Sequence, residues 1–188
     1  MEGILNIWGC FSEKHPRTSR WIREGGLFVI VSNIITVLKY LMLQFFPAVF
    51  AGMPMVDFGW PGKEITVFGE TFKWYMLGYD VSLGGLPYFC AYMVAMVLGE
   101  CINFPIQRNF VFRSNGNIWH QIMWYILAFF IITCIVNSIN CVYVAVAGKY
   151  VPDFIYNIGT TVLNGGVSML IFFFANKVIF PGEEKTDR

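Results

Sequence analysis

The sequence predicts an all-α integral membrane protein with four transmembrane helices, arranged as two parallel helical-hairpin repeats with both termini in the cytoplasm. Three observations support this prediction. Hydrophobic residues make up 56% of the 188 residues and charged residues only 13%, whereas soluble domains average about 25% charged. An apolar excess of this size does not fit inside a soluble core this small. Four apolar stretches are long enough to cross a bilayer, and lysine and arginine gather on one side of them.

The four predicted spans form one membrane domain over residues 24–180. A span needs about 20 residues, and the stretches run over about 24–46, 87–109, 119–147 and 156–180. The third exceeds this length, so we expect it to tilt or to continue past the membrane. No cleavable signal peptide precedes the first span, because the preceding residues are mostly polar and lack a small-residue cleavage site. We therefore expect the first span to be retained.

The distribution of cations predicts the orientation. Nine lysines and arginines lie on the side of both termini and three on the opposite side. The nine are Lys14, Arg17, Arg20, Arg23, Arg108, Arg113, Lys177, Lys185 and Arg188, and the three are Lys63, Lys73 and Lys149. The positive-inside rule then places residues 1–23, as an interfacial segment, and the tail 181–188 in the cytoplasm. We expect that tail to be disordered.

The outer loop, residues 47–86, is rich in aromatic residues that favour the membrane–water interface, such as Trp60 and Trp74. Residues 65–68 and 71–75, with Gly69 and Glu70 between them, predict a short β-hairpin. We expect this loop to lie on the outer surface.

A degenerate internal repeat relates the two helical hairpins. Phe-Val-Phe at 110–112 ends the second span, and Val-Ile-Phe at 178–180 ends the fourth, 68 residues later. Because both hairpins start and finish on the cytoplasmic side, the two copies would be related by an axis along the membrane normal.

Polar residues occur at helical spacing in every span, so each set shares one helix face. If the four faces meet inside the bundle, they line a hydrophilic crevice. The candidate substrate-binding residues are Asn33, Lys39, Glu100, Asn103, Gln107, Arg108, Asn137, Asn140 and Asn164. A structural reading stays open for each amide, because such residues also join transmembrane helices through hydrogen bonds worth about 0.6 kcal/mol.

Glu100 and Lys39 favour a functional reading more strongly. A charge at mid-bilayer costs about 2.5–3.5 kcal/mol on insertion scales, several times the value of one such hydrogen bond. The two side chains could pair, although counting along each helix from the cytoplasmic side puts them about 8 Å apart in height. In the alternative reading, Lys39 extends outward to the interface.

Several function classes are excluded. The chain has no phosphate-binding glycine loop, no Gly-x-Ser-x-Gly elbow and no HExxH motif, and too little sequence lies outside the membrane for a catalytic domain. We therefore do not expect an enzyme. The five cysteines and two histidines lack metal-ligand spacing, so no metal or cofactor is expected. The chain has no basic tract with interleaved aromatic residues, so we do not expect nucleic acid as a partner.

Asn-Phe-Pro-Ile-Gln-Arg-Asn-Phe-Val-Phe-Arg at 103–113, at the end of the second of four spans, resembles the signature of the GtrA-like membrane proteins of bacteria. Their signature is Asn-Phe-apolar-apolar-Asn-Arg-x-aromatic-Val-Phe, with a weaker copy ending the fourth span, as at 172–180 here. The resemblance covers about residues 23–180. The chain departs from the family in its long outer loop and its eroded second copy.

The resemblance implies translocation of a polyprenyl-phosphate-linked sugar across the bacterial cytoplasmic membrane, for glycosylation of cell-surface polysaccharides such as teichoic acid. It implies a membrane glycosyltransferase as a partner, and it carries over Asn103, Gln107 and Arg108 as motif residues. We expect Arg108 to bind the phosphate at the inner side and Lys39 to bind it farther out. The amides would replace water around the sugar, and Glu100 would bind sugar hydroxyls or Arg108, or carry a coupling proton.

Other hypotheses stay open. A homodimer would shield the headgroup better than one four-helix chain. A second hypothesis is a scaffold that holds a polyprenyl-phosphate glycosyltransferase at the membrane without transport. A third is a small proton-coupled cation exporter, with Glu100 as the shared site for proton and substrate.

Overall fold

The computed structural model describes residues 9–181, and these contain four helical spans long and apolar enough to cross a membrane. They run over Pro16–Val49, Gly85–Val111, Ile118–Tyr150 and Phe154–Ile179. The chain is therefore a multi-pass membrane protein. Of the expected interfacial segment at 1–23, residues 9–14 are helical and the first span already begins at Pro16, while residues 1–8 lie outside the described residues, as does the expected disordered tail at 182–188.

The first two spans are helix α2 (Pro16–Val49) and helix α3 (Gly85–Ile106), which continues as a π-helical turn at Gln107–Val111. Proline begins α2, where its missing N–H costs nothing, and the helix starts well before the predicted residue 24. Pro105 removes a backbone donor near the end of α3. The following turn closes with the Phe112 N–H donating to the Gln107 carbonyl at 3.0 Å, the wider spacing of a π-turn.

The third span is helix α4 (Ile118–Tyr150). The Asn117 side chain caps its start, accepting hydrogen bonds from the Trp119 and His120 N–H groups at 3.0 and 3.3 Å. The fourth span is divided into helix α5 (Asp153–Thr161), a π-helical stretch (Val162–Val167) and helix α6 (Ser168–Ile179). The four predicted spans are thus confirmed, apart from their ends.

Small residues let α3 approach α2 closely. Ala91, Ala95 and Gly99 recur every four residues on α3 and are buried, so they lie on one face of the helix. Small residues at such spacing are typical of tightly packed transmembrane helices. The α2–α3 interface is accordingly the most extensive helix contact in the described structure.

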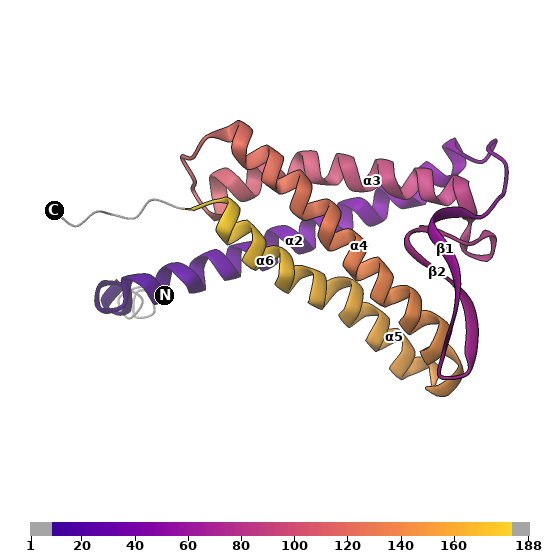
Figure 1. The fold of residues 1–188 in the computed structure, drawn as a ribbon. Helices are drawn as coiled ribbons and strands as arrows, with labels where there is room; N and C mark the ends of the chain where they lie inside the picture. Colours follow the sequence, from indigo (N-terminus) through magenta and orange to yellow (C-terminus); the bar gives the residue numbers. More distant parts are fainter. Residues whose placement is uncertain (1–8, 182–188) are drawn as a thin grey trace.

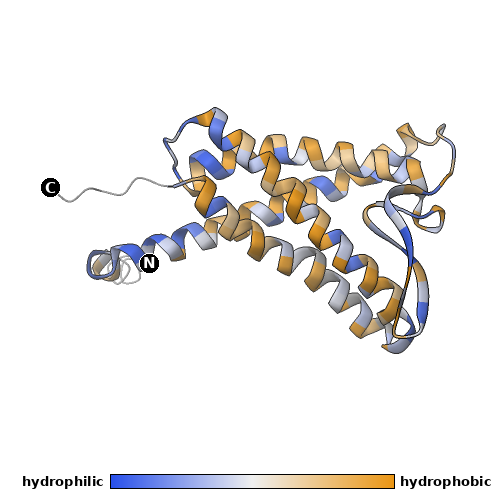
Figure 2. Ribbon diagram, in the orientation of Figure 1, coloured by the Kyte–Doolittle hydropathy of each residue, from blue (hydrophilic) through white to orange (hydrophobic). Residues whose placement is uncertain are grey.

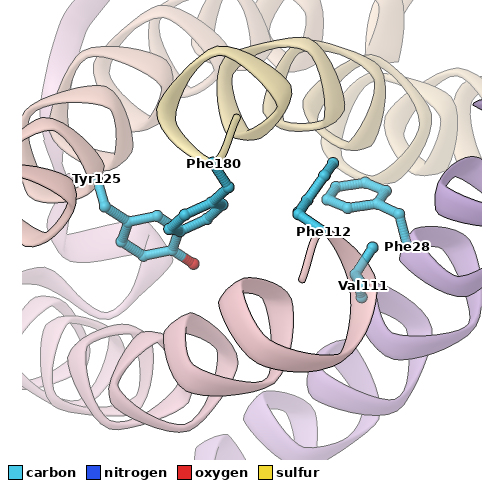
Figure 3. Packing of buried hydrophobic residues seen from close by; sticks show 5 residues of the cluster. All are labelled: Phe28, Val111, Phe112, Tyr125 and Phe180. Atoms are coloured by element: carbon cyan, nitrogen blue, oxygen red, sulfur yellow. The ribbon is translucent and has the colours of Figure 1, made fainter. Parts of the chain in front are cut away.

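The two helix pairs, α2 with α3 and α4 with α5–α6, meet at one end of the molecule and diverge toward the other (Figure 1). We call the end where α2 begins and α6 finishes the inner end, following the predicted orientation. A cluster of buried side chains fills it, with contributions from all four spans (Figure 3): Phe28, Val111, Phe112, Tyr125 and Phe180. The Phe112 and Phe180 rings, related by the proposed repeat, lie 5.8 Å apart between centroids.

The outer loop forms an antiparallel β-hairpin of strands β1 (Phe58–Val67) and β2 (Glu70–Tyr79). The predicted hairpin is confirmed but is longer, and its two-residue turn lies at Phe68 and Gly69, one residue earlier than predicted. Both turn residues have positive φ angles, 51° and 83°, as two-residue hairpin turns require. The prediction of an all-α protein is therefore correct for the membrane spans and wrong for the outer loop.

The hairpin crosses the outer end and packs on α4. The Trp74 indole N–H donates to the Ser138 hydroxyl at 3.1 Å, and the Tyr150 hydroxyl donates to the Phe68 carbonyl at 3.2 Å. At its base Lys73 forms an ion pair with Asp57, which lowers the pKa of Asp57 and raises that of Lys73. Figure 2 shows hydrophilic residues along the hairpin and at the inner ends of the helices, with mainly apolar residues between.

The close contact of α3 with α2 generates a prediction about two glycines. A Cβ added at Gly99 would lie 2.3 Å from the Cε of Lys39, whereas one added at Gly26 would meet nothing within 4 Å. We expect Gly99→Ala to lose about 1–3 kcal/mol of stability through overpacking. Gly26→Ala, the matched control on the exposed side of α2, should gain up to about 1 kcal/mol. Unfolding midpoints in detergent measure both, and equal midpoints would contradict the packing described.

Candidate functional site

The candidate site is centred on Glu100 of α3, whose two carboxylate oxygens are both occupied. One oxygen pairs with the Lys39 ammonium of α2, and the two side chains are only 12% and 14% exposed. The other accepts hydrogen bonds from the Tyr125 hydroxyl of α4 and from the Asn103 amide, the latter at 3.0 Å. A single carboxylate thus joins three membrane-spanning helices.

A chain of polar side chains continues from Glu100 toward the inner end. The Asn103 side-chain amide also donates to the Tyr125 hydroxyl at 2.9 Å, and the Gln107 side-chain amide donates to the side-chain oxygen of Asn103 at 3.2 Å. These residues share one face of α3, as their spacing predicts. Gln107 is fully buried, and its side-chain oxygen has no hydrogen-bond partner among the described residues.

The pairing of Lys39 with Glu100 confirms one of the two readings of Lys39 and corrects the estimated height difference. The Phe28 ring packs against the Phe112 ring at the inner end, with centroids 6.3 Å apart. A helix rises 1.5 Å per residue, so Lys39 lies about 17 Å outward from Phe28 along α2. Glu100 lies about 18 Å outward from Phe112 along α3, which puts the two charges at nearly the same height. The 8 Å offset was wrong because it was counted from predicted span ends, which do not lie level with each other.

Arg108 lies at the inner end of α3 and is oriented by the start of α4. Its guanidinium donates to the side-chain oxygen of Gln121 at 2.8 Å, to the carbonyl of Gly116 at 3.1 Å and to the side-chain oxygen of Asn109 at 2.9 Å. These contacts use three of the five N–H groups of the guanidinium. Arg108 is half-buried, so it is fixed in position while remaining at the surface.

The prediction that all polar faces meet in one crevice is wrong. Asn33 is exposed on α2 and donates to the Val29 carbonyl of its own helix at 2.7 Å. Asn137 and Asn140 lie on the outer half of α4, where Asn137 donates to the Met76 carbonyl of β2 at 3.3 Å. The side chain of Asn164 is outside the described part of the structure. The faces separate because α4 diverges from α3 toward the outer end (Figure 1).

Two cavities lie between the hairpin and α4. The larger, about 860 Å³, has a mainly apolar lining that includes Phe68, Trp74 and Val146. The smaller, about 400 Å³, is lined in part by Asn137 and Asn140. Neither cavity is lined by Glu100, Asn103, Gln107 or Arg108. Of the predicted substrate residues, Lys39, Glu100, Asn103, Gln107 and Arg108 therefore lie along α2 and α3 toward the inner end, whereas Asn137 and Asn140 line the smaller cavity and Asn33 lies in neither region.

Sequence reasoning missed several residues of the inner end. Gln121 and Tyr125 are buried partners of the motif residues, and their i, i+4 spacing on α4 could have indicated them. Glu24 is the first residue of the first predicted span, and its local pattern predicts no partner. It is buried and pairs with Arg20 at 2.9 Å and with Lys177, whose ammonium lies 3.8 Å from the centre of the Trp21 ring.

A buried amide on α6 adds unused hydrogen-bonding capacity at the inner end. Asn176 is 1% exposed, and neither its side-chain nitrogen nor its oxygen has a partner among the described residues. Its backbone carbonyl accepts from the Phe180 N–H at 2.7 Å, which places it one helical turn before Phe180, toward the middle of the last span. Buried amides without protein partners are uncommon and indicate a site for water or a ligand.

Comparisons with known protein families, with curated proteins and with solved structures found no match to this chain. The resemblance to the GtrA-like proteins therefore stays a prediction from the motif at 103–113. Among residues 9–181, no group of histidine, cysteine and acidic side chains has the arrangement of a metal site.

The buried ion pair generates a prediction for a double-mutant cycle. Removing one partner leaves an unpaired charge among apolar helices, so Lys39→Met and Glu100→Gln should each cost about 3–5 kcal/mol. The double variant should cost much less than the sum, because no charge is left unpaired. Unfolding free energies of the four proteins measure the coupling. Additive losses would show that the two side chains do not form an ion pair in the membrane.

Proposed function

We propose that the protein moves a polyprenyl-phosphate-linked sugar across a bacterial cytoplasmic membrane, for glycosylation of a cell-surface polysaccharide. The observation that carries this proposal is the polar chain from Lys39 and Glu100 to Gln107, which ends beside Arg108. Charged and amide groups inside apolar helices are costly and usually mark the path of a polar substrate. A bundle that serves only as an anchor has no need of such a chain.

The chemistry of the inner end suits the headgroup of such a lipid. A guanidinium binds a phosphate through two parallel hydrogen bonds, and Arg108 is held at the inner surface with N–H groups beyond the three in use. Sugar hydroxyls need hydrogen-bond partners inside a membrane. The unpartnered atoms of Gln107 and Asn176 supply both acceptors and donors at this level.

The ion pair forms the outer end of the inner polar chain. Tyr125 bonds Glu100, and Asn137 follows 12 residues later on α4, about 18 Å farther out at the rise of a helix. A headgroup passing from this chain to the smaller cavity must pass the ion pair. We therefore assign Lys39 and Glu100 the role of a gate, which opens when hydroxyls or a phosphate replace their mutual contact. The prenyl chain stays outside, against the exposed apolar side chains of the helices.

The test is transport by the purified chain in liposomes. A fluorescent polyprenyl-phosphate sugar is loaded in one leaflet, and its arrival in the other is followed by a membrane-impermeant quencher. We expect Arg108→Ala to slow translocation at least about tenfold, the value of one charge-assisted hydrogen bond of about 1.4 kcal/mol. Arg17→Ala, which removes an exposed charge from the inner end of α2, is the matched control and should leave the rate unchanged.

Other outcomes identify the alternatives. Lack of translocation, together with a stable complex with a polyprenyl-phosphate glycosyltransferase, would replace the proposal with the scaffold function. Proton-dependent movement of a hydrophobic cation that is lost in Glu100→Gln would replace it with the exporter function.

A further inference from the structure

The smaller cavity differs in chemistry from both the polar chain of α3 and the larger cavity. It has a volume of about 400 Å³ between β2 and the outer half of α4, within the range of about 300–1,000 Å³ for small-ligand sites. Its lining gathers two amides, two phenol rings, a cation and a carboxylate: Asn137, Asn140, Tyr75, Tyr79, Lys73 and Asp80. The larger cavity has no charged residue in its lining.

The polar walls of this cavity are fixed by contacts outside it. Asn137 is held by its hydrogen bond to the Met76 carbonyl of β2 at 3.3 Å. The Tyr79 ring packs edge-on against Tyr88 and Tyr92 of α3, with centroid distances of 4.9 and 5.6 Å. Lys73 is positioned by its ion pair with Asp57. The cavity therefore lies under the hairpin where α3 and α4 diverge, with side chains oriented before any ligand binds.

We propose that this cavity is an outer binding site for the sugar of a lipid-linked saccharide. Amide and carboxylate groups exchange hydrogen bonds with sugar hydroxyls, and tyrosine rings present apolar faces with polar tips to the sugar ring. Lys73 supplies a cation for the phosphate that joins sugar and lipid. The site rests on the proposed function for the identity of its ligand, but its residues are separate from the inner polar chain.

Position in the membrane favours a lipid-linked sugar over a free one. The cavity is bounded on one side by α4, a membrane-spanning helix, and on the other by the hairpin, which the sequence predicts to lie on the outer surface. A sugar whose lipid chain lies in the outer leaflet reaches this cavity by moving along the protein surface, while its lipid chain stays in the membrane. The lipid also holds the sugar at the depth of the cavity, which raises its effective concentration there.

The test is equilibrium binding to the full-length chain in lipid nanodiscs. The probes are polyprenyl phosphate carrying glucose, galactose or N-acetylglucosamine, each compared with sugar-free polyprenyl phosphate. We expect at least one sugar lipid to bind about tenfold more tightly than the sugar-free lipid, and Asn140→Leu to abolish that preference. Asn33→Leu makes the same change on the exposed face of α2 and should keep the preference.

A second variant separates loss of the site from loss of folding. Ala145 lines the cavity, so Ala145→Leu should fill it without removing a polar group and should also abolish the preference. The proposal is overturned if no sugar lipid binds better than the sugar-free lipid, or if the preference survives both cavity variants.

The outcome is distinguishable from that of the transport test. Translocation that depends on Arg108, combined with sugar preference unchanged in Asn140→Leu, would reject the outer site and keep the proposed function. Sugar preference that is lost in Asn140→Leu, without any translocation in liposomes, would keep the outer site and reject the proposed function.

Discussion

Lys39 and Glu100 form an ion pair between α2 and α3, inside helices that are otherwise apolar. Water cannot solvate either charge at this depth, so each depends on the other and on added hydrogen bonds. Gly99 makes room for the lysine stem, and Tyr125 and Asn103 occupy the second carboxylate oxygen. The pair therefore fixes the relative height of α2 and α3 and connects both to α4.

The divergence of the two helix pairs gives the molecule two polar regions instead of one. Aromatic packing of Phe112 and Phe180 closes the inner end, while the hairpin bridges the outer end through contacts such as Trp74 with Ser138. Between these ends the ion pair joins α2 to α3, and the Tyr125 hydroxyl joins Glu100 and Asn103 of α3 to α4. This arrangement is that of a bundle closed at its inner end, with a cavity at its outer end that is covered by the hairpin.

Much of the fold could be predicted because its signals are local. The length and hydropathy of the apolar stretches locate the four spans. A spacing of i, i+3 and i+7 puts Glu100, Asn103 and Gln107 on one helix face. Residues that favour strands on both sides of Gly69 indicate the hairpin. The prediction that Asn137 and Asn140 lie close to that face of α3 was wrong. The distance between the two faces depends on the angle between α3 and α4, and this angle is set by side-chain packing at the inner end. Local sequence patterns carry no information about such an angle.

Infrared spectroscopy of Glu100 shows whether the buried pair of Lys39 and Glu100 is ionised. Infrared difference spectra of the wild-type chain and the Glu100→Gln variant, recorded in lipid bilayers at neutral pH, isolate the absorption of this one side chain. An ion pair with Lys39 requires the bands of an ionised carboxylate, which should shift in Lys39→Met. A protonated carboxyl band in the wild-type chain would contradict the account, because a neutral Glu100 would neither hold Lys39 nor require it.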